Sequence, residues 1–294
     1  MRYRRFGQSD LVVSEVGFGT WTLVTDWWGR TDHPHAMITA ALDAGINFID
    51  TAPVYGTEGA GESILAPYLT VRDDIVITTK CGYDIKAERK FPGQSERPAD
   101  WRPESIRQQC EDSLRRLNTD RIDLYLLHWR GNYKLKDTLA GFQALVKDGL
   151  IKAWGVSNFG AGDMDELAAL PGGDAVATNQ MPYSLARRGI ETDPLPWCRA
   201  RGIPIMAYSP VDQGRILADR TLASVAGRHG ASPAQVALAF VLLHKDMIVI
   251  PKATSPTHVR ENRAALDLEL TKADLAELGK AFPPPRGAPP LEML

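Results

Sequence analysis

Eight short apolar runs recur along the chain, separated by stretches in which apolar residues have the spacing of helices. The runs span residues 15–19, 47–50, 75–80, 124–128, 153–157, 176–180, 205–208 and 247–251. Runs that are apolar at nearly every position are typical of strands buried on both faces, as in parallel sheets. Parallel strands need crossover connections, which helices usually provide. The pattern therefore predicts a sheet of parallel strands covered by helices.

Two of the intervening segments illustrate the helical spacing. Within residues 103–117, apolar or small side chains recur with the period of a helix, at Ile106, Cys110, Ser113, Leu114 and Leu117. Residues 233–243 are mostly apolar and begin with proline, and Ser232 before them is the expected N-cap. Both segments are predicted to be helices that pack on the sheet.

The number of repeats favours a closed barrel over an open, doubly wound sheet. Eight strand–helix units within about 250 residues match a (β/α)8 (TIM) barrel. No glycine-rich dinucleotide fingerprint follows the first run, as a doubly wound cofactor-binding sheet would require. We expect a single α/β barrel domain over residues 1–294.

Two segments lie outside the repeat. Residues 3–6 and 11–13, joined by the turn-forming residues 7–10, are expected to form a β-hairpin that plugs the bottom of the barrel. Residues 271–282 are expected to form an extra helix capped by a Thr-x-x-Asp sequence. The proline-rich tail that follows, residues 283–290, cannot continue this helix, so it is expected to be an extended strap or disordered.

The composition indicates an ordinary globular protein. A net charge of −2, with 44% hydrophobic and 24% charged residues, allows one large core and offers no basic surface for nucleic acid or anionic membranes. The three cysteines, Cys81, Cys110 and Cys198, lack the spacing of metal ligands or of a disulfide framework. No apolar run approaches the roughly 20 residues that cross a bilayer. We expect a cytoplasmic protein without a metal, either a monomer or a weak homo-oligomer.

Three of the apolar runs end in an aspartate, a lysine or a histidine. Asp50 closes the second run, and Tyr55 follows five positions later; Lys80 closes the third run and His128 the fourth. The carboxyl ends of barrel strands share one rim, so we expect these side chains to converge there. Each residue alone has an ordinary explanation as a turn, surface or core residue. Their coincidence at corresponding strand ends favours a catalytic site.

Together these groups can carry out acid–base chemistry. A phenol with an unperturbed pKa near 10 is a poor acid at neutral pH. A positive charge about 4 Å away, at an effective dielectric constant of about 20, is worth roughly 4 kcal/mol, or about three pKa units. Lys80 is therefore expected to lower the pKa of Tyr55. Asp50 would keep the lysine charged and oriented, and His128 would hydrogen-bond a substrate oxygen.

Several blocks of sequence resemble the aldo-keto reductases, in particular the bacterial, short-loop type. They comprise residues 47–55, 61–63, 77–80, 123–128, 155–158 and 208–210, and the resemblance extends from residue 11 to residue 268. It implies a (β/α)8 barrel that binds NADP(H) without a Rossmann motif. It also implies reduction of an aldehyde or ketone, or the reverse oxidation of an alcohol or sugar, by direct hydride transfer. The implied catalytic tetrad is Asp50, Tyr55, Lys80 and His128, with Tyr55 as general acid and base.

The same resemblance implies how the nicotinamide half of the cofactor is bound. Ser157, Asn158 and Gln180 would hydrogen-bond the carboxamide, while Tyr208 would stack on the ring. The cofactor would also pass close to a set of residues at the strand ends: Gly19, Thr20, Trp21, Asp50, Ser209, Pro210, Val211, Gln213 and Gly214. The backbone after Tyr208 is expected to approach the pyrophosphate, although its glycine can equally mark a turn.

The adenosine half departs from the best-known members of the family. The residues that resemble the 2′-phosphate and adenine site are Lys252, Ala253, Thr254, His258, Glu261 and Asn262. Many reductases place an arginine where this chain has His258, and a neutral imidazole cannot grip phosphate as a guanidinium does. Arg260 could substitute for it or could be a solvated helix residue. We expect NADP as cofactor, with NAD possible.

Aromatic residues in the loops after the strands are the candidates for substrate contact. They are Trp21, Trp27, Trp28, Tyr83 and Trp129, and a polar run follows at residues 84–100. Aromatic walls around a carbonyl site suit sugars or aromatic aldehydes. Trp27 and Trp28 could instead pack the loop, and Arg130 could recognise a substrate carboxylate or lie exposed on the rim.

Two classes of function remain open from sequence. The first is a carbonyl reductase with a small carbonyl or sugar substrate. The second is a non-catalytic, cofactor-binding regulatory subunit with the same barrel, similar to the potassium-channel β subunits. The presence of all four catalytic residue types favours the enzyme.

Overall fold

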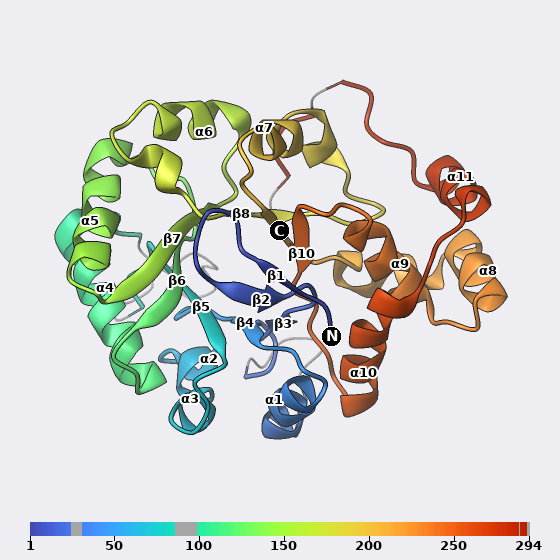
Figure 1. Ribbon diagram of the computed structural model, residues 1–294, viewed down its shortest axis with the longest axis horizontal. Coiled ribbons are helices and arrows are strands. Elements are labelled where there is room, and N and C mark those ends of the chain that lie inside the picture. The colour runs from blue at the N-terminus through green and yellow to red at the C-terminus, as the bar shows by residue number, and fades with distance from the viewer. Residues whose placement is uncertain (25–30, 86–98, 288, 293–294) are drawn as a thin grey trace, which may run out of the picture.

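The computed structural model describes residues 1–24, 31–85, 99–287 and 289–292, in which eight parallel strands form a barrel (Figure 1). The strands pair in chain order: β3 (Phe18–Gly19), β4 (Phe48–Asp50), β5 (Val76–Cys81), β6 (Ile122–Leu127), β7 (Ile151–Ser157), β8 (Asn179–Pro182), β9 (Ile205–Tyr208) and β10 (Met247–Val249). A parallel bridge between Val16 and Val249 joins the first strand to the last, and Gly19 N donates to Pro251 O at 3.1 Å. The predicted (β/α)8 fold is confirmed.

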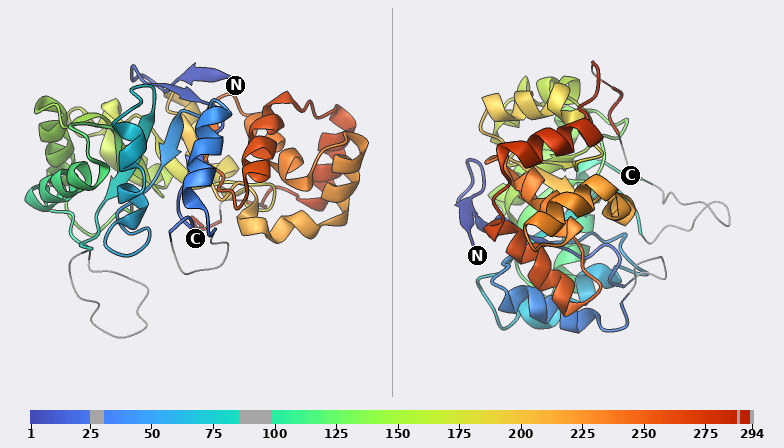
Figure 2. Two further views of the ribbon diagram at one scale, coloured as in Figure 1. Left: turned by 90° about the horizontal axis from the view of Figure 1, so that it is seen from below. Right: turned by 90° about the vertical axis from the view of Figure 1, so that its right-hand side faces the viewer.

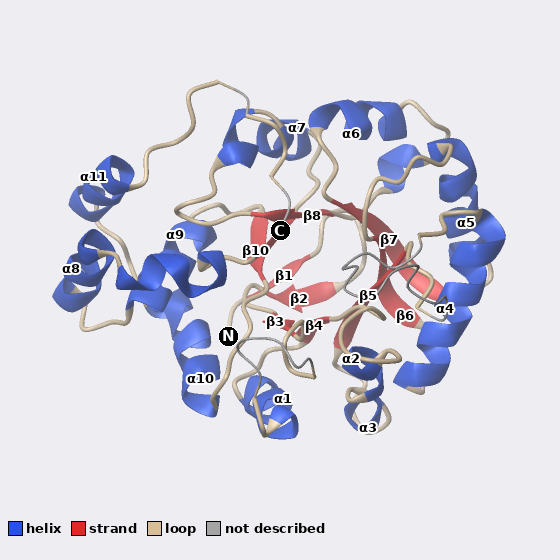
Figure 3. Ribbon diagram, turned by 180° about the vertical axis from the view of Figure 1, so that it is seen from behind, coloured by secondary structure: helices blue, strands red, loops and turns tan. Residues whose placement is uncertain are grey.

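Helices surround the strands on the outside of the barrel (Figure 3). They are α1 (Pro34–Asp43), α2 (Ala60–Ser63), α3 (Ala66–Leu69), α4 (Pro103–Leu117), α5 (Leu135–Lys147), α6 (Ala161–Ala168), α7 (Pro194–Ala200), α8 (Arg220–Arg228), α9 (Pro233–Leu242), α10 (Pro256–Ala264) and α11 (Lys272–Ala281). The predicted helices at 103–117 and 233–243 correspond to α4 and α9, and Ser232 caps α9 by accepting from Gln235 N. Within the described part of the chain, no helix is long and apolar enough to cross a membrane.

Every expected strand overlaps an observed one, but the boundaries differ by up to three residues. The largest differences are at β3, expected from residue 15, and at β8, expected from residue 176. A run of apolar residues shows that a segment is buried, whereas the strand ends depend on where the neighbouring strand supplies hydrogen-bond partners. The boundaries therefore cannot be read from one strand alone.

The N-terminal hairpin closes one end of the barrel. β1 (Tyr3–Arg5) and β2 (Val12–Ser14) pair in antiparallel fashion and lie across that end (Figures 1 and 2). Phe6, Leu11 and Val13 are buried in one cluster with inward-facing strand residues, and the rings of Phe6 and Phe48 lie 5.6 Å apart. The predicted plug is confirmed. A site that opens to solvent must therefore lie at the opposite end, where the strands terminate.

The carboxyl-terminal segment returns toward the barrel after α11 (Figure 1). Thr271 caps α11 by accepting from Asp274 N, as its Thr-x-x-Asp sequence predicts. The described tail residues 283–287 and 289–292 form no helix or strand. Glu292 in this tail accepts a hydrogen bond from Arg187 Nη1 at 2.7 Å, and Phe282 O accepts one from Arg188 Nη1 at 2.9 Å. Of the two forms expected, the tail takes that of an extended strap.

Candidate active site

A buried lysine–aspartate pair lies at the carboxyl ends of β4 and β5. Lys80 Nζ donates to both carboxylate oxygens of Asp50, at 2.8 and 2.9 Å, and to Thr51 O at 2.9 Å. Lys80 is 0% exposed and Asp50 3% exposed. A buried ammonium needs a charged partner and filled hydrogen bonds, and this one has both. The parallel register of β4 and β5 places the two side chains in this position.

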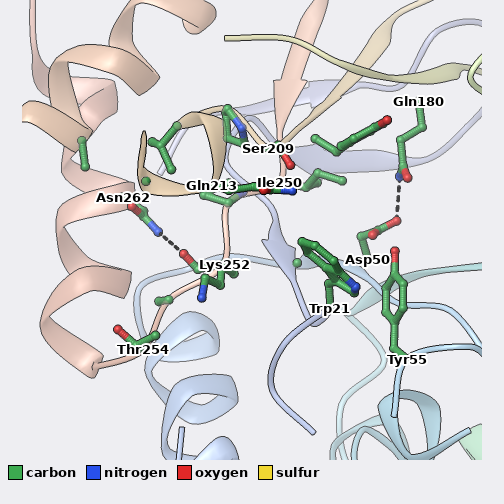
Figure 4. Close-up of a pocket in the computed structure, with 18 of the residues that line it drawn as sticks. Trp21, Asp50, Tyr55, Gln180, Ser209, Gln213, Ile250, Lys252, Thr254 and Asn262 are labelled. Atoms are coloured by element: carbon green, nitrogen blue, oxygen red, sulfur yellow. Dashed lines mark hydrogen bonds between the residues drawn. The ribbon is translucent and has the colours of Figure 1, made fainter. Parts of the chain in front are cut away.

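Tyr55 and His128 complete the cluster above this pair. Tyr55 lies in the loop after β4, and its Oη accepts a hydrogen bond from Lys80 Nζ at 3.2 Å. His128 directly follows β6, and its ring lies 6.3 Å from the Tyr55 ring, edge to face. Figure 4 shows Tyr55 and Asp50 side by side at the edge of a cavity. The structure thus brings together the four residues that the sequence singled out as catalytic.

The pKa of Tyr55 moves in the direction opposite to the one expected from sequence. Burial, and then the negative charge of Asp50, raise the pKa of the phenol well above its ordinary value of 10. Burial is the larger cause, and the negative charge of Asp50, which accepts two hydrogen bonds from Lys80, adds to it. Tyr55 is therefore fully protonated at neutral pH.

Burial also shifts the pKa values of Lys80 and His128. Burial lowers the pKa of Lys80, and the adjacent Asp50 opposes this effect. Burial and the charge of Lys80 hold the pKa of His128 well below 6.5. His128 is therefore a neutral imidazole at neutral pH, able to donate one hydrogen bond and accept another.

Gln180 on β8 makes a contact that the sequence did not indicate. Its Nε2 donates to Asp50 Oδ1 at 2.7 Å (Figure 4). With the two bonds from Lys80, this contact fixes the orientation of the carboxylate. Gln180 was expected from the resemblance to contact the nicotinamide carboxamide, and its side chain does line the cavity.

Three further expected cofactor residues form a hydrogen-bonded chain on the barrel rim. Tyr208 Oη donates to Asn158 Oδ1 at 2.9 Å, and Asn158 Nδ2 donates to Ser157 Oγ at 3.0 Å. Asn158 has a left-handed backbone (φ 60°), which is uncommon for residues other than glycine. The surroundings must therefore hold it, and the result is that the tyrosine ring is fixed beside the cavity.

The loop after β9 is also strained. Ser209, Asp212 and Gln213 have φ values of 49°, 47° and 56°. Left-handed conformations of such residues persist only where neighbouring groups enforce them, and they cluster at functional sites. Asp212 is buried, and its Oδ1 accepts from Arg187 Nε at 2.6 Å. This contact lies outside the cavity and holds the loop against the barrel.

A cavity of about 1050 Å³ runs from the cluster of Asp50, Tyr55 and His128 to the N-terminal end of α10. Of the residues expected to bind cofactor or substrate, those that line it are Gly19, Trp21, Asp50, Tyr83, Trp129, Ser157, Asn158, Gln180, Tyr208, Ser209, Pro210, Val211, Gln213, Gly214, Lys252, Ala253, Thr254, His258, Glu261 and Asn262. Tyr55 and His128 line it as well. Thr20 does not: it is fully buried, and its Oγ1 donates to Asp50 O at 3.1 Å.

The far end of the cavity is built from residues 252–262. Asn262 Nδ2 donates to Lys252 O at 3.2 Å (Figure 4), and Thr254 Oγ1 lies 3.0 Å from His258 Nδ1. Partial burial lowers the pKa of Lys252. Arg260 is exposed, bonds to Thr257 and does not line the cavity, which argues against its substituting for the missing arginine.

The structure describes only some of the residues that were expected to contact the substrate. Trp21, Tyr83 and Trp129 line the cavity near the catalytic cluster, whereas Trp27 and Trp28 lie outside the described residues, as does most of the polar run at 84–100. The side chain of Arg130 does not line the cavity. Its Nη2 donates to both carboxylate oxygens of Glu166, at 3.0 and 2.8 Å, and its Nη1 donates to backbone carbonyls.

Some lining residues were not among the site residues expected from sequence: Val54, Leu217, Ser232, Pro233 and Ala234. Ile250 and Pro251 also line the cavity, next to Lys252 in the segment that resembles the 2′-phosphate site. The Ser-Pro pair at 232–233 was identified only as the start of a helix, and its position beside the cavity follows from the way α9 packs. Among the described residues, no group of three histidine, cysteine or acidic side chains is placed to hold a metal ion.

Comparison with known proteins gives a consistent set of matches. Residues 15–282 match the aldo/keto reductase family. The methylglyoxal reductase YeaE of Escherichia coli (strain K12) is 41% identical over 291 residues, which cover 97% of this chain and 96% of that protein. The NADH-specific methylglyoxal reductase of the same strain is 32% identical over 91% of this chain and 94% of that protein.

A solved structure also superposes along the full length of the chain. The aldo-keto reductase from Klebsiella pneumoniae, crystallised in complex with NADPH, is 37% identical to it. The superposition has a TM-score of 0.86 and covers 100% of this chain and 99% of the Klebsiella chain. The likeness thus extends over the whole barrel.

Proposed function

The chain belongs to the aldo/keto reductase family, and on this premise we propose that it reduces small carbonyl compounds, with 2-oxoaldehydes such as methylglyoxal as the leading substrate class and NADPH as reductant. The observation that carries the proposal is the 3.2 Å contact between Lys80 Nζ and Tyr55 Oη at the edge of a large cavity. The substrate class is suggested by two relatives that are named as methylglyoxal reductases.

The cavity fits a dinucleotide together with a small substrate. Its volume of about 1050 Å³ is at the upper end of the range for small-molecule sites. We propose that Ser157, Asn158 and Gln180 hold the carboxamide of the nicotinamide and that Tyr208 supports its ring. When bound, NADPH would supply the hydride to the carbonyl carbon.

The far end of the cavity offers the features that a 2′-phosphate needs. Lys252 brings a positive charge, and Thr254 and His258 bring side chains that can hydrogen-bond to phosphate oxygens. The helix α10 begins at Pro256, between Thr254 and His258, and a helix N-terminus favours anions. We propose these groups as the basis of a preference for NADPH over NADH.

Tyr55 is the proposed general acid. Its raised pKa keeps the proton on Oη until the carbonyl oxygen gains negative charge and becomes the stronger base. Lys80 then donates its hydrogen bond to the phenolate that remains, and Asp50 keeps Lys80 in place. In the oxidation direction, the same phenolate would accept the proton from an alcohol.

The substrate would lie between the catalytic cluster and aromatic walls. His128, being neutral, can donate a hydrogen bond to the carbonyl oxygen without competing for its proton. Trp21, Tyr83 and Trp129 limit the space around that oxygen and reduce the access of water. Arg130 is paired with Glu166, so nothing in its position favours a substrate carboxylate.

A binding role without turnover is the competing possibility, as in a cofactor-dependent regulatory subunit. The geometry of the tetrad speaks against it. A protein that only binds cofactor has no need for a buried ion pair directed at a phenol, because burying charges is costly even when they are paired. We therefore favour an enzyme over a regulatory subunit.

The test is the rate of NADPH consumption with methylglyoxal, for the native chain and for Tyr55→Phe. We expect a loss of about 10²- to 10⁴-fold in kcat, which is the usual contribution of a general acid–base group. Cofactor affinity, measured by fluorescence titration, should change less than about twofold. Equally negligible rates for both proteins, with NADPH still bound, would support the regulatory subunit.

A further inference from the structure

Glu62 is a buried carboxylate without a role in the site described above. It lies in α2 and is 0% exposed. Glutamate is almost never fully buried unless its charge is paired. Its sequence neighbours, residues 61–63, form one of the blocks that resemble the family, yet none of them lines the cavity. The position of Glu62 therefore needs an explanation within the protein.

Each carboxylate oxygen of Glu62 is bonded to a different element. Thr79 Oγ1 in β5 donates to Oε1 at 2.6 Å, and Arg116 Nε in α4 donates to Oε2 at 2.6 Å. Thr79 directly precedes Lys80. Because side chains alternate along a strand, Thr79 faces the helices while Lys80 faces the barrel interior. Glu62 is thus bonded to the strand position next to the catalytic lysine.

The same short helix also holds Tyr55. Gly61 N donates to Tyr55 O at 2.9 Å. A Cβ atom added at Gly61 would lie 2.8 Å from Tyr55 Cβ and 3.0 Å from Tyr55 O. The helix therefore packs against Tyr55 with no room for a side chain at position 61. The backbone of Tyr55 must therefore follow any displacement of α2.

α2 cannot keep its place through its own helical bonds. It has four residues, about one turn, and helices of this length are unstable in isolation. The side chain of Arg116 covers its N-terminal end: a Cβ at Gly59 would lie 2.4 Å from Arg116 Cδ. The bonds of Glu62 to Thr79 and Arg116 therefore anchor α2, which contacts Tyr55, to β5 and α4.

We propose that Glu62 is a positioning residue for the reaction, which ties the Tyr55 segment to the Lys80 strand and so keeps Tyr55 Oη within hydrogen-bond distance of Lys80 Nζ. The proposal rests on the proposed function of Tyr55 and Lys80. A displacement of about 1 Å at a reacting group can cost on the order of 100-fold in rate, so a fixed separation has a catalytic value. Glu62 itself touches neither the cavity nor the reacting atoms.

The sharpest test removes one bond of the carboxylate and leaves its charge in place. Thr79→Val is nearly isosteric and deletes only the donor to Glu62 Oε1. We expect kcat with methylglyoxal to fall about 10-fold, while the KM and the NADPH dissociation constant change less than about twofold. The solvent deuterium isotope effect on kcat should rise, because proton transfer from Tyr55 becomes slower.

Two matched variants serve as controls. Thr78→Val makes the same change one position earlier in β5, at a buried hydroxyl that has no hydrogen-bond partner among the described residues. Its kcat should stay within about twofold of the native value. Thr79→Ser keeps the hydroxyl and should restore kcat to within about threefold. Equal effects of Thr79→Val and Thr78→Val, or a failure of serine to rescue, would overturn the proposal.

A structural measurement makes the test independent of turnover. In crystals of Thr79→Val, we expect the distance from Lys80 Nζ to Tyr55 Oη to exceed about 3.5 Å, beyond a normal hydrogen bond. An unchanged distance of 3.2 Å, as in the native chain, would contradict the positioning role. Should the native chain and Tyr55→Phe both prove inactive, the proposed function fails, and this distance still decides the structural role of Glu62.

Discussion

The two ends of the cavity differ in how firmly the protein holds them. At the end proposed as catalytic, Asp50 and Lys80 are buried and bonded to each other, and Gln180 adds a further bond to the carboxylate. At the other end, Lys252 is half-buried and His258 is exposed. The chemistry of the first end is therefore organised by contacts within the protein, whereas binding at the second depends on a few side chains in contact with solvent.

This difference separates two kinds of mutational effect. Substitutions at the catalytic end disturb a network of buried charges, so they should affect turnover and stability together. Substitutions at the other end, where we propose that the adenosine half binds, remove single, screened interactions, so they should change the choice of cofactor and leave turnover intact. The following changes test this separation, beginning with the largest expected effect.

Lys80→Met should lower kcat by more than about 1000-fold, because Tyr55 loses the group that stabilises its phenolate. It should also lower the free energy of unfolding by about 3–5 kcal/mol, since Asp50 becomes a buried charge without a cation. The double variant Asp50→Asn/Lys80→Met removes both charges and should regain much of that stability, but no activity. Steady-state kinetics and denaturant unfolding measure the two effects, and a kcat within tenfold of the native value would contradict the assigned role.

Lys252→Ala should weaken NADPH binding about 10-fold, or about 1.4 kcal/mol, as expected for one partly exposed contact to phosphate. NADH lacks the 2′-phosphate, so its affinity should change less than about twofold. Fluorescence titration with both cofactors gives the comparison. Arg260→Ala is the matched control, because this arginine is exposed and does not line the cavity. Equal weakening of NADPH and NADH would show that Lys252 is not the phosphate contact.

His258→Arg should tighten NADPH binding by a few-fold, roughly 3- to 5-fold, because a guanidinium can form two parallel bonds to a phosphate. Binding of NADH should not change. The ratio of the two dissociation constants is the quantity to measure. No change in that ratio would place the 2′-phosphate away from position 258.

The pH dependence of reduction should show almost no effect over the neutral to mildly alkaline range. The pKa of Tyr55 is raised well above 10, so the phenol keeps its proton there, and the pKa of His128 is lowered well below 6.5, so the imidazole stays neutral. We expect kcat to vary less than about twofold between about pH 7 and pH 9. A loss of activity centred near pH 8 would mean that Tyr55 is a stronger acid than its surroundings indicate.

The fold and the four central residues could be predicted because both leave local marks in the sequence. Apolar runs that alternate with helical spacing define the barrel, and Asp50, Lys80 and His128 stand at the ends of such runs. Parallel strands place these ends on one rim whatever the sequence separation. The cofactor residues came from the family resemblance, and the cavity brings nearly all of them together.

Other features could not be predicted because they depend on the relative positions of distant side chains. The raised pKa of Tyr55 follows first from its burial and then from the negative charge of Asp50. The contact between Gln180 and Asp50 joins residues 130 positions apart. Arg130 pairs with Glu166 of α6, a residue 36 positions away, rather than facing the site. None of these has a local signature in the chain.

The side chain of Arg187 has a practical consequence for anyone who prepares the protein. One guanidinium bonds both to Asp212, in the strained loop beside the cavity, and to Glu292, in the terminal strap. An affinity tag fused after Leu294 would begin only a few residues beyond Glu292. Dissociation constants measured on such a fusion would include any disturbance of the loop, so a tag that can be cleaved off before the measurement is the safer choice.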